Sequence, residues 1–236
     1  MRRPNNRWFC RVVAVLAVVA AILTGFLASE SDARDPLWQS LPWQARLGPN
    51  WFQARAERGD VESMYRLGLL YEKGAGVAAD PARAAQWYRR AARAGHPRAQ
   101  FRLGRFKERG IGGKADPEAA ARWYGKAAGA GIAPAAYKLG LLILRGGAGE
   151  PDPARAATLF RQAARAGLAE GWMSLGLLHA TGRGVDKDPV KAAALLVRAA
   201  RAEVPGAAKV RDRLLTGLSD AQARRARRRG MHAGGP

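Results

Sequence analysis

The chain has 236 residues, and 48% of them are hydrophobic, so a folded protein with a core is expected and an intrinsically disordered one is excluded. Forty lysines and arginines stand against 19 acids, and the formal net charge of +21 predicts attraction to anionic surfaces. The single cysteine, Cys10, excludes an intramolecular disulfide and, with only three histidines in the chain, makes a structural zinc site unexpected.

Residues 1–33 are predicted to be a signal peptide or a membrane anchor. Four arginines and no acid precede an uncharged apolar stretch at 12–28. This stretch is longer than the ~7–15 apolar residues of a cleaved signal and shorter than the ~20 of a spanning helix, so cleavage after Ala33 and an uncleaved anchor both remain open. A buried core helix is the third interpretation. Because the arginines resist translocation, both export interpretations place the following residues in the cell envelope, on the periplasmic side.

From residue 59 onward, several residue types recur at intervals of 36 residues, with no insertion between the copies. The recurring sets are Gly68, Gly104, Gly140 and Gly176; Asp80-Pro81, Asp116-Pro117, Asp152-Pro153 and Asp188-Pro189; and Gly59, Gly95, Gly131 and Gly167. They predict four repeats, at 59–94, 95–130, 131–166 and 167–203. Residues 34–58 are predicted to be a linker and a degenerate half repeat, since Trp51-Phe52 lies 36 residues before Trp87-Tyr88.

Each repeat is predicted to form two helices. In the first repeat, small and apolar residues recur with helical spacing from about Val61 to Lys73, and Gly74 suits the end of that helix. Asp80 is placed to cap the second helix, with Pro81 in its first position. Gly68 and its equivalents are expected to be structurally required, because a glycine within a helix costs about 1 kcal/mol relative to alanine and implies a close approach by the partner helix. The second helix is expected to turn these residues toward the core: Ala84, Ala85, Trp87, Tyr88, Ala91 and Ala92.

The repeat resembles the Sel1-like repeat family, a relative of the tetratricopeptide repeats. The resemblance rests on the stretches SMYRLGLLYEKGAGVAADPARAAQWYRRAARAG and AQFRLGRFKERGIGGKADPEAAARWYGKAAGAG, with further copies that begin at Ala135 and Gly171. It covers residues 59–203 and implies an all-α fold, a right-handed α-solenoid of antiparallel helix pairs, in a protein that binds other proteins. The later repeats depart from the pattern, because Leu159 and Leu195 replace the tryptophan and Glu203 replaces the closing glycine.

Residues 204–236 are predicted to cap the array and to end in a basic tail, because the last unit of a solenoid needs a cover for its apolar face. Val210, Leu214 and Leu215 suit one helix. Ser219 and Gln222 have the spacing of a capping box that opens another helix, and arginines follow at 224, 225 and 227–229.

No catalytic, cofactor-binding or metal-binding set is apparent, so the chain is not expected to be an enzyme. The recurring aspartates Asp80, Asp116, Asp152 and Asp188 are each followed by proline, which favours helix capping over acid–base catalysis. The Gly-x-Gly loops follow a helix, whereas the dinucleotide fingerprint follows a strand. His96 and His179 have no suitably placed cysteine or paired acid and are expected to be surface or satisfied core histidines.

Two surfaces are candidates for binding a partner. By analogy with tetratricopeptide repeats, part of the first helix of each repeat faces a concave groove, and two sets of residues recur there: Tyr65, Phe101, Tyr137 and Met173, and, one turn further on, Leu69, Arg105, Leu141 and Leu177. The alternative is that these side chains form core between repeats. The second candidate surface is the basic outer side of the second helices, which is either a solvated helix face or a site for anionic partners.

The sequence therefore predicts a non-enzymatic scaffold of the bacterial cell envelope that holds a partner protein of open identity. The alternatives are a basic module that binds anionic envelope polymers or lipids, and a cell-wall hydrolase. Nucleic acid is not expected as a partner because of the predicted compartment. The membrane is a partner through residues 12–28 if that segment is not cleaved.

Overall fold

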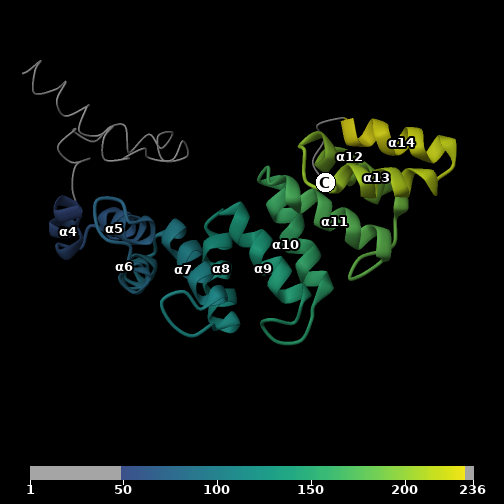
Figure 1. Ribbon diagram of the computed structural model, residues 1–236. Coiled ribbons are helices and arrows are strands. Elements are labelled where there is room, and N and C mark those ends of the chain that lie inside the picture. The colour runs from purple at the N-terminus through teal and green to yellow at the C-terminus, as the bar shows by residue number, and fades with distance from the viewer. Residues whose placement is uncertain (1–48, 232–236) are drawn as a thin grey trace, which may run out of the picture.

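The computed structural model describes residues 49–231, and the described residues form helices joined by short loops, with no β-strand among them (Figure 1). The predicted signal or anchor of residues 1–33 lies outside the described residues. Among residues 49–231, no helix has both the length and the apolar character that a membrane span requires. The helices are α4 (Pro49–Glu57), α5 (Val61–Lys73), α6 (Pro81–Arg93), α7 (Pro97–Arg109), α8 (Pro117–Gly129), α9 (Ala133–Leu144), α10 (Pro153–Arg165), α11 (Ala169–Thr181), α12 (Pro189–Arg201), α13 (Ala207–Thr216) and α14 (Asp220–Met231).

The helices form an elongated α-solenoid, with α4 at one end and α13 and α14 at the other (Figure 1). Each repeat is a helix pair, namely α5–α6, α7–α8, α9–α10 and α11–α12, and each pair packs against the next along the chain. We call the first helix of each pair helix A and the second helix B. The all-α fold is thereby confirmed, and α4 is the helix B of the predicted half repeat, packed against α5.

Local sequence signals set the helix ends. Asp80, Asp116, Asp152 and Asp188 each accept a hydrogen bond at 2.8–2.9 Å from the backbone N–H three residues later, at the start of a helix B whose first residue is proline. Gly74 ends α5 in the left-handed conformation, with φ 71°. These contacts confirm the predicted caps, which satisfy backbone groups that the helix itself leaves unpaired.

In the first three repeats, the mid-helix glycine of helix A lies against a buried ring of helix B. A Cβ atom added to Gly104 would lie 2.7 Å from the ring of Tyr124, and one added to Gly140 would lie 2.7 Å from the ring of Phe160. The rings of Tyr88, Tyr124 and Phe160 are fully buried. Helix A and helix B can therefore pack this closely only because glycine leaves room for the ring.

The prediction that Trp87 and Tyr88 both face the core is confirmed, because Tyr88 is fully buried and Trp87 packs against the same hydrophobic cluster, but the two rings have different places. Successive residues of a helix point about 100° apart, so only one of the two rings can lie over Gly68. Trp87 is half-buried, and the guanidinium carbon of Arg90 lies 4.4 Å from the centroid of its ring. Trp123 is also half-buried, with the Nζ atom of Lys126 4.7 Å from its ring centroid.

The C-terminal helices close the array as predicted. The Ser219 N–H donates to Oε1 of Gln222 at 3.0 Å, and the Gln222 N–H donates to Oγ of Ser219 at 3.4 Å, which is the reciprocal capping box. Helix α14 packs against α12 through the fully buried Ala226 and through Gly230, whose added Cβ would lie 2.6 Å from Cβ of Val197.

The docking of α14 has a cause in the sequence of α12. The face of α12 that α14 covers carries Ala194 and Val197, both buried. At the position of Ala194, the earlier repeats carry polar residues that are exposed, namely Gln86, Arg122 and Thr158. An apolar pair on this face of the last helix B therefore creates the contact that ends the solenoid.

Candidate functional site

The predicted partner-binding residues lie on the four A helices α5, α7, α9 and α11. We call the surface that they form the helix-A surface, defined by Tyr65, Leu69, Phe101, Arg105, Tyr137, Leu141, Met173 and Leu177. Tyr65 is buried, with 6% of its surface exposed, and Leu177 is exposed, at 39%. The other six residues are half-buried. They therefore present part of each side chain to solvent while the rest packs inside.

The aromatic members of this surface pack inward on helix B of their own repeat. The ring centroids of Tyr65 and Tyr88 are 6.0 Å apart, and those of Phe101 and Tyr124 are 5.8 Å apart, as are those of Tyr137 and Phe160. Phe101 and Tyr137 also pack against the buried cluster that includes residues of α9 such as Leu139. These aromatic residues therefore contribute to the core, which was the alternative prediction, and Phe101 and Tyr137 are also partly exposed to solvent.

A recurring set of polar contacts joins neighbouring A helices. The hydroxyl of Tyr88 donates to Oε2 of Glu72, and Nη1 of Arg102 in the next repeat donates to Oε1 of the same carboxylate at 3.1 Å. One repeat later, the hydroxyl of Tyr124 donates to Oε2 of Glu108 at 2.6 Å. The Nζ atom of Lys138 lies 3.9 Å from that oxygen. We call each set a carboxylate link.

Burial raises the pKa of the Tyr88 hydroxyl, and the charge of the Glu72 carboxylate raises it further. Burial likewise raises the pKa of Tyr124, together with its hydrogen bond to Glu108. Both hydroxyls therefore remain protonated donors to carboxylates that are themselves half-buried.

Sequence reasoning missed the carboxylate links, although a signal for them is present. The members are in register, because each residue of the first link has its equivalent 36 residues later. At the next set of equivalent positions, which would join the third repeat to the fourth, all three members change together to Phe160, Leu144 and Ser174. No carboxylate or cation is then left unpaired at these positions.

His96 is a structural histidine at the start of α7. Its Nδ1 accepts the N–H of Ala99 at 3.1 Å, so the ring proton belongs on Nε2, which faces Oε2 of Glu62 at 2.9 Å. Its ring stacks on Tyr65 at 4.5 Å between centroids. The hydrogen bond from His96 lowers the pKa of Glu62, and Arg66 lowers it further, against the opposing effect of burial. The predicted role as a satisfied histidine is confirmed for His96.

His179 is satisfied only in part. It is buried, with 5% of its surface exposed, and its Nδ1 lies 3.0 Å from the carbonyl oxygen of Asp186. Its Nε2 has no hydrogen-bond partner among the described residues. Within residues 49–231, no group of three His, Cys, Asp or Glu side chains is arranged to hold a metal ion.

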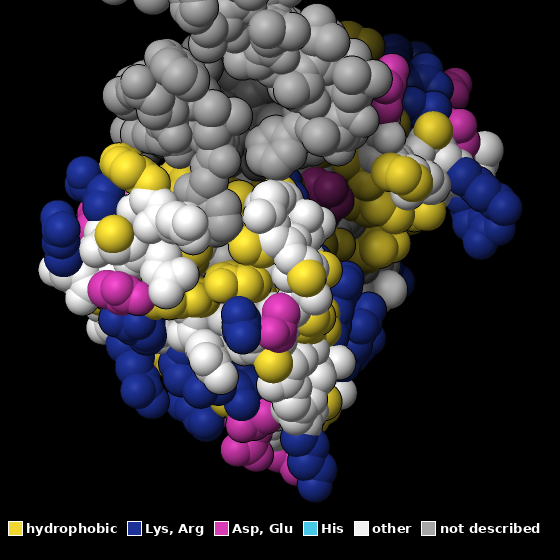
Figure 2. All heavy atoms as spheres, turned by 60° about the vertical axis from the view of Figure 1, so that its left-hand side comes forward, with side chains coloured by type: hydrophobic (Ala, Val, Ile, Leu, Met, Phe, Trp, Pro, Cys, Tyr) yellow, Lys and Arg dark blue, Asp and Glu magenta, His cyan; other side chains and the backbone are white. Residues whose placement is uncertain are grey.

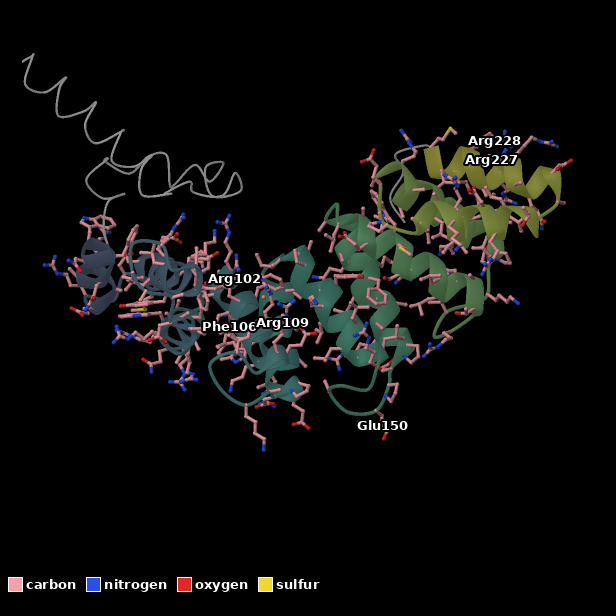
Figure 3. The ribbon with its side chains drawn as sticks, in the orientation of Figure 1. Arg102, Phe106, Arg109, Glu150, Arg227 and Arg228 are labelled. Carbon is pink, nitrogen blue, oxygen red and sulfur yellow. The ribbon has the colours of Figure 1, made fainter. Side chains whose placement is uncertain are left out.

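The helix-A surface changes its chemistry along the array. Helix α7 carries five basic residues and one acid, and Figure 3 labels two of its arginines, Arg102 and Arg109. Helix α9 carries one lysine and no acid, and its surface positions hold Tyr137, Leu141 and Leu144. The surface is therefore positively charged over α7 and mainly apolar over α9 and α11.

The outer side of the B helices is basic. Exposed arginines such as Arg83, Arg93 and Arg122 lie there. Figure 2 shows lysine and arginine side chains mainly around the margins of the face that it draws. A groove of about 430 Å³ lies on α10, lined by Thr158, Arg161, Gln162, Arg165 and Ala166, away from the helix-A residues named above. Helix α14 adds five exposed arginines, of which Figure 3 labels Arg227 and Arg228.

Solved structures of bacterial proteins share this architecture. A protective antigen of uropathogenic Escherichia coli that displays an SLR fold has a TM-score of 0.71 and 29% identity over 89% of this chain and 43% of its own. A Sel1 repeat protein from Oxalobacter formigenes has a TM-score of 0.65 and 27% identity over 80% of this chain and 78% of its own. The chain thus spans less than half of the length of the Escherichia coli antigen, and no curated protein sequence matches it.

The family comparison rests on the repeats themselves. The sequence profile of the Sel1 repeat matches residues 61–96, 97–132, 133–168 and 173–204, which together make up more than half of the chain. The four matches coincide with the four helix pairs α5–α6 to α11–α12. The chain therefore belongs to the Sel1 repeat family.

Proposed function

We propose that the chain is a non-enzymatic scaffold that binds a partner protein through the helix-A surface. Sel1 repeats generally mediate protein–protein interaction. The observation that carries the proposal is the line of partly exposed side chains across four successive A helices, which ends at the exposed Leu177. Exposed apolar groups beside charged ones are typical of surfaces that bind other proteins.

Site-specific photo-crosslinking in living cells tests this proposal. A photoreactive phenylalanine analogue is placed at Arg105 or Leu177 on the helix-A surface, and at the exposed Arg122 on the outer side of α8 as a matched control. Discrete crosslinked products are expected from the first two positions and not from the control. Equal products from all three positions, or none from Arg105 and Leu177, would contradict the proposal.

We also propose that the scaffold acts in the cell envelope, with its repeats on the periplasmic side. Support comes from the arginines and apolar stretch at residues 1–28 and from the bacterial origin of the two similar structures. Alkaline phosphatase fused after Pro236 is expected to be active, because this enzyme is active only when exported, and a β-galactosidase fusion is expected to be inactive. The reverse pattern would place the repeats in the cytoplasm.

The basic helix α14 favours a second candidate function, binding of anionic envelope polymers or lipids. Its five arginines are exposed, and none forms a salt bridge with an acid among the described residues: Arg224, Arg225, Arg227, Arg228 and Arg229. Vesicles that contain phosphatidylglycerol are expected to co-sediment with the chain at low salt and to lose it at high salt, because salt screens exposed charges. Replacement of the five arginines by glutamine should abolish sedimentation, and unchanged sedimentation would remove this candidate.

A further inference from the structure

The helix-A surface is continuous from α5 to α11. Arg102 of α7 reaches Glu72 of α5, and Lys138 of α9 reaches toward Glu108 of α7. Tyr137 and Leu141 of α9 pack against the same buried cluster as Trp172 of α11. A single bound segment can therefore contact several A helices in turn.

The α7 part of this surface carries positive charge that the protein does not neutralise. The single acid of α7, Glu108, is engaged by Tyr124 and Lys138. Arg105 is half-buried and Arg109 is exposed, and neither forms a salt bridge with an acid among the described residues. Arg105 takes the place that leucine holds in the other three repeats. A partly desolvated guanidinium gains most from a carboxylate supplied by a partner, because both then form charge-assisted hydrogen bonds.

The α9 and α11 part of the surface is apolar. Among the described residues, two large hydrophobic side chains are exposed: Leu177 and, at the end of α14, Met231. Leu141, Leu144 and Met173, which lie on α9 and α11, are half-buried. Leu144 and Ala180 occupy the positions at which the first two repeats carry Glu72 and Glu108. Apolar side chains of a partner would remove this area from water.

We infer that the helix-A surface recognises a protein segment in which a cluster of acidic residues adjoins an apolar stretch. The inference rests on the proposed scaffold function and names the chemistry of its partner. Nucleic acids and acidic polysaccharides supply the negative charge and leave the apolar half uncovered. The acidic cluster lies over α7 and the apolar stretch over α9 and α11. Neighbouring A helices are on the order of 10 Å apart, so the two parts of an extended ligand are separated by roughly three to seven residues.

Selection of peptides by the full chain tests the inference. A random 16-residue peptide library displayed on phage is panned against the immobilised full chain, and the enriched peptides are synthesised with a fluorescent label. We expect them to combine acidic residues with an adjoining apolar run. Affinities are then measured by fluorescence polarisation for the parent and for Arg105→Glu, Leu177→Ser and the control Arg122→Glu on the outer side of α8.

Arg105→Glu and Leu177→Ser are each expected to weaken binding at least about tenfold, and Arg122→Glu to change it less than about twofold. Panning repeated on the Arg105→Glu/Arg109→Glu variant should no longer enrich acidic peptides. Circular dichroism melting of each variant establishes that it is folded. Leu177→Ser and Arg105→Glu change side chains that are exposed or half-buried, so their folds are expected to persist.

The outcomes separate the two proposals. Peptides that depend on Arg105 and Leu177 but lack acidic residues would overturn the inference and leave the scaffold function standing. Peptides that bind the Arg105→Glu and Leu177→Ser variants as tightly as the parent, or the absence of any enriched peptide, would overturn the scaffold function at this surface as well. Self-association of the full chain that Leu177→Ser abolishes would identify a second copy as the occupant and overturn the inference.

Discussion

The first two repeats and the last two share one backbone plan but hold neighbouring helices together by different means. In α5 to α8, and across to α9, buried tyrosine hydroxyls, carboxylates and basic groups form the two carboxylate links. In the third and fourth repeats the corresponding positions are apolar or small, and the ring over Gly140 belongs to Phe160, which has no hydroxyl. A buried tyrosine hydroxyl is costly without its acceptor, and a half-buried carboxylate is costly without its donors, so the members of such a link are kept or replaced as a set.

The carboxylate links also help to explain why the helix-A surface is basic over α7 and apolar over α9 and α11. The carboxylates of the links are paired with cations on the next A helix, Arg102 on α7 and Lys138 on α9, and α7 carries further arginines. Where the links are absent, the same positions are free to carry leucine, and α9 and α11 become apolar. Helix α7, which takes part in both carboxylate links, thus presents basic groups to a partner, and α9 and α11 present mainly apolar groups.

The largest expected effect on stability comes from the mid-helix glycines, and it differs between the second repeat and the fourth. Gly104→Ala would place a methyl group 2.7 Å from the fully buried ring of Tyr124, and we expect a loss of about 1–3 kcal/mol in the free energy of unfolding. Gly176→Ala would bring its Cβ only to 3.2 Å from Leu196 and the carbonyl oxygen of Ala192. Its cost is expected to be offset in part by the better helix propensity of alanine, about 1 kcal/mol. Urea unfolding of both variants measures the difference, and equal losses would show that the ring contact does not control this position.

The carboxylate link can be broken in one region and transplanted into the other. Tyr124→Phe removes the hydroxyl that Glu108 accepts, and a loss of about 1–2 kcal/mol in unfolding free energy is expected. Phe160→Tyr places a hydroxyl beside Leu144, without an acceptor, at a similar cost.

The triple variant Phe160→Tyr/Leu144→Glu/Ser174→Lys should recover stability relative to Phe160→Tyr alone, as measured by thermal and urea unfolding. A triple variant less stable than the single one would refute the idea that the three positions act as a set.

A smaller effect is expected at the end of the fourth repeat. Glu203 is the only non-glycine residue with positive φ among the described residues, at 56°, where the earlier repeats have Gly59, Gly95, Gly131 and Gly167. Glu203→Gly should stabilise the protein by about 0.5–1 kcal/mol, because the left-handed conformation is strained for a residue with a Cβ. Differential scanning calorimetry tests this, with the reverse change Gly167→Glu as the matched control, which should destabilise.

The smallest expected effect is a pH dependence of stability that comes from Glu62 in the first repeat. The pKa of Glu62 is lowered by His96 and Arg66, so the unfolded chain binds more protons than the folded chain below the ordinary pKa of a glutamate. The contribution of Glu62 is therefore fully present above the ordinary pKa of a glutamate and is lost as the pH falls through the lowered pKa of Glu62. Urea midpoints of the parent and of Glu62→Gln should converge over this range. A constant difference between the two curves would count against the ionised Glu62 as the cause.

The sequence was sufficient for the elements whose causes are local. The helix from Val61 to Lys73, the aspartate caps, the left-handed glycines and the Ser219–Gln222 capping box were all predictable, because each depends on residues within one or two turns of one another. The interval of 36 residues then fixed the number of repeats and the solenoid class, since a repeat that cannot bury its own face must stack on its neighbours.

The candidate site was predictable only as a set of positions. The sequence placed Tyr65 and Leu177 in equivalent positions of helix A, and the structure buries the first to 6% and exposes the second to 39%. That difference depends on neighbours distant in sequence, such as the stacking of His96 on Tyr65. Periodicity along one helix carries no information about these contacts.

Tertiary structure alone decided three further features. It selected Tyr88 over Trp87 as the ring that covers Gly68, joined Glu72 to residues 16 and 30 positions away, and docked α14 on α12. In each case several side chains could occupy the position by local rules, and the choice was made by close packing and by the need to pair buried polar groups. Local sequence thus determined where the helices begin and end, and the fit between helices determined which side chains were left for a partner.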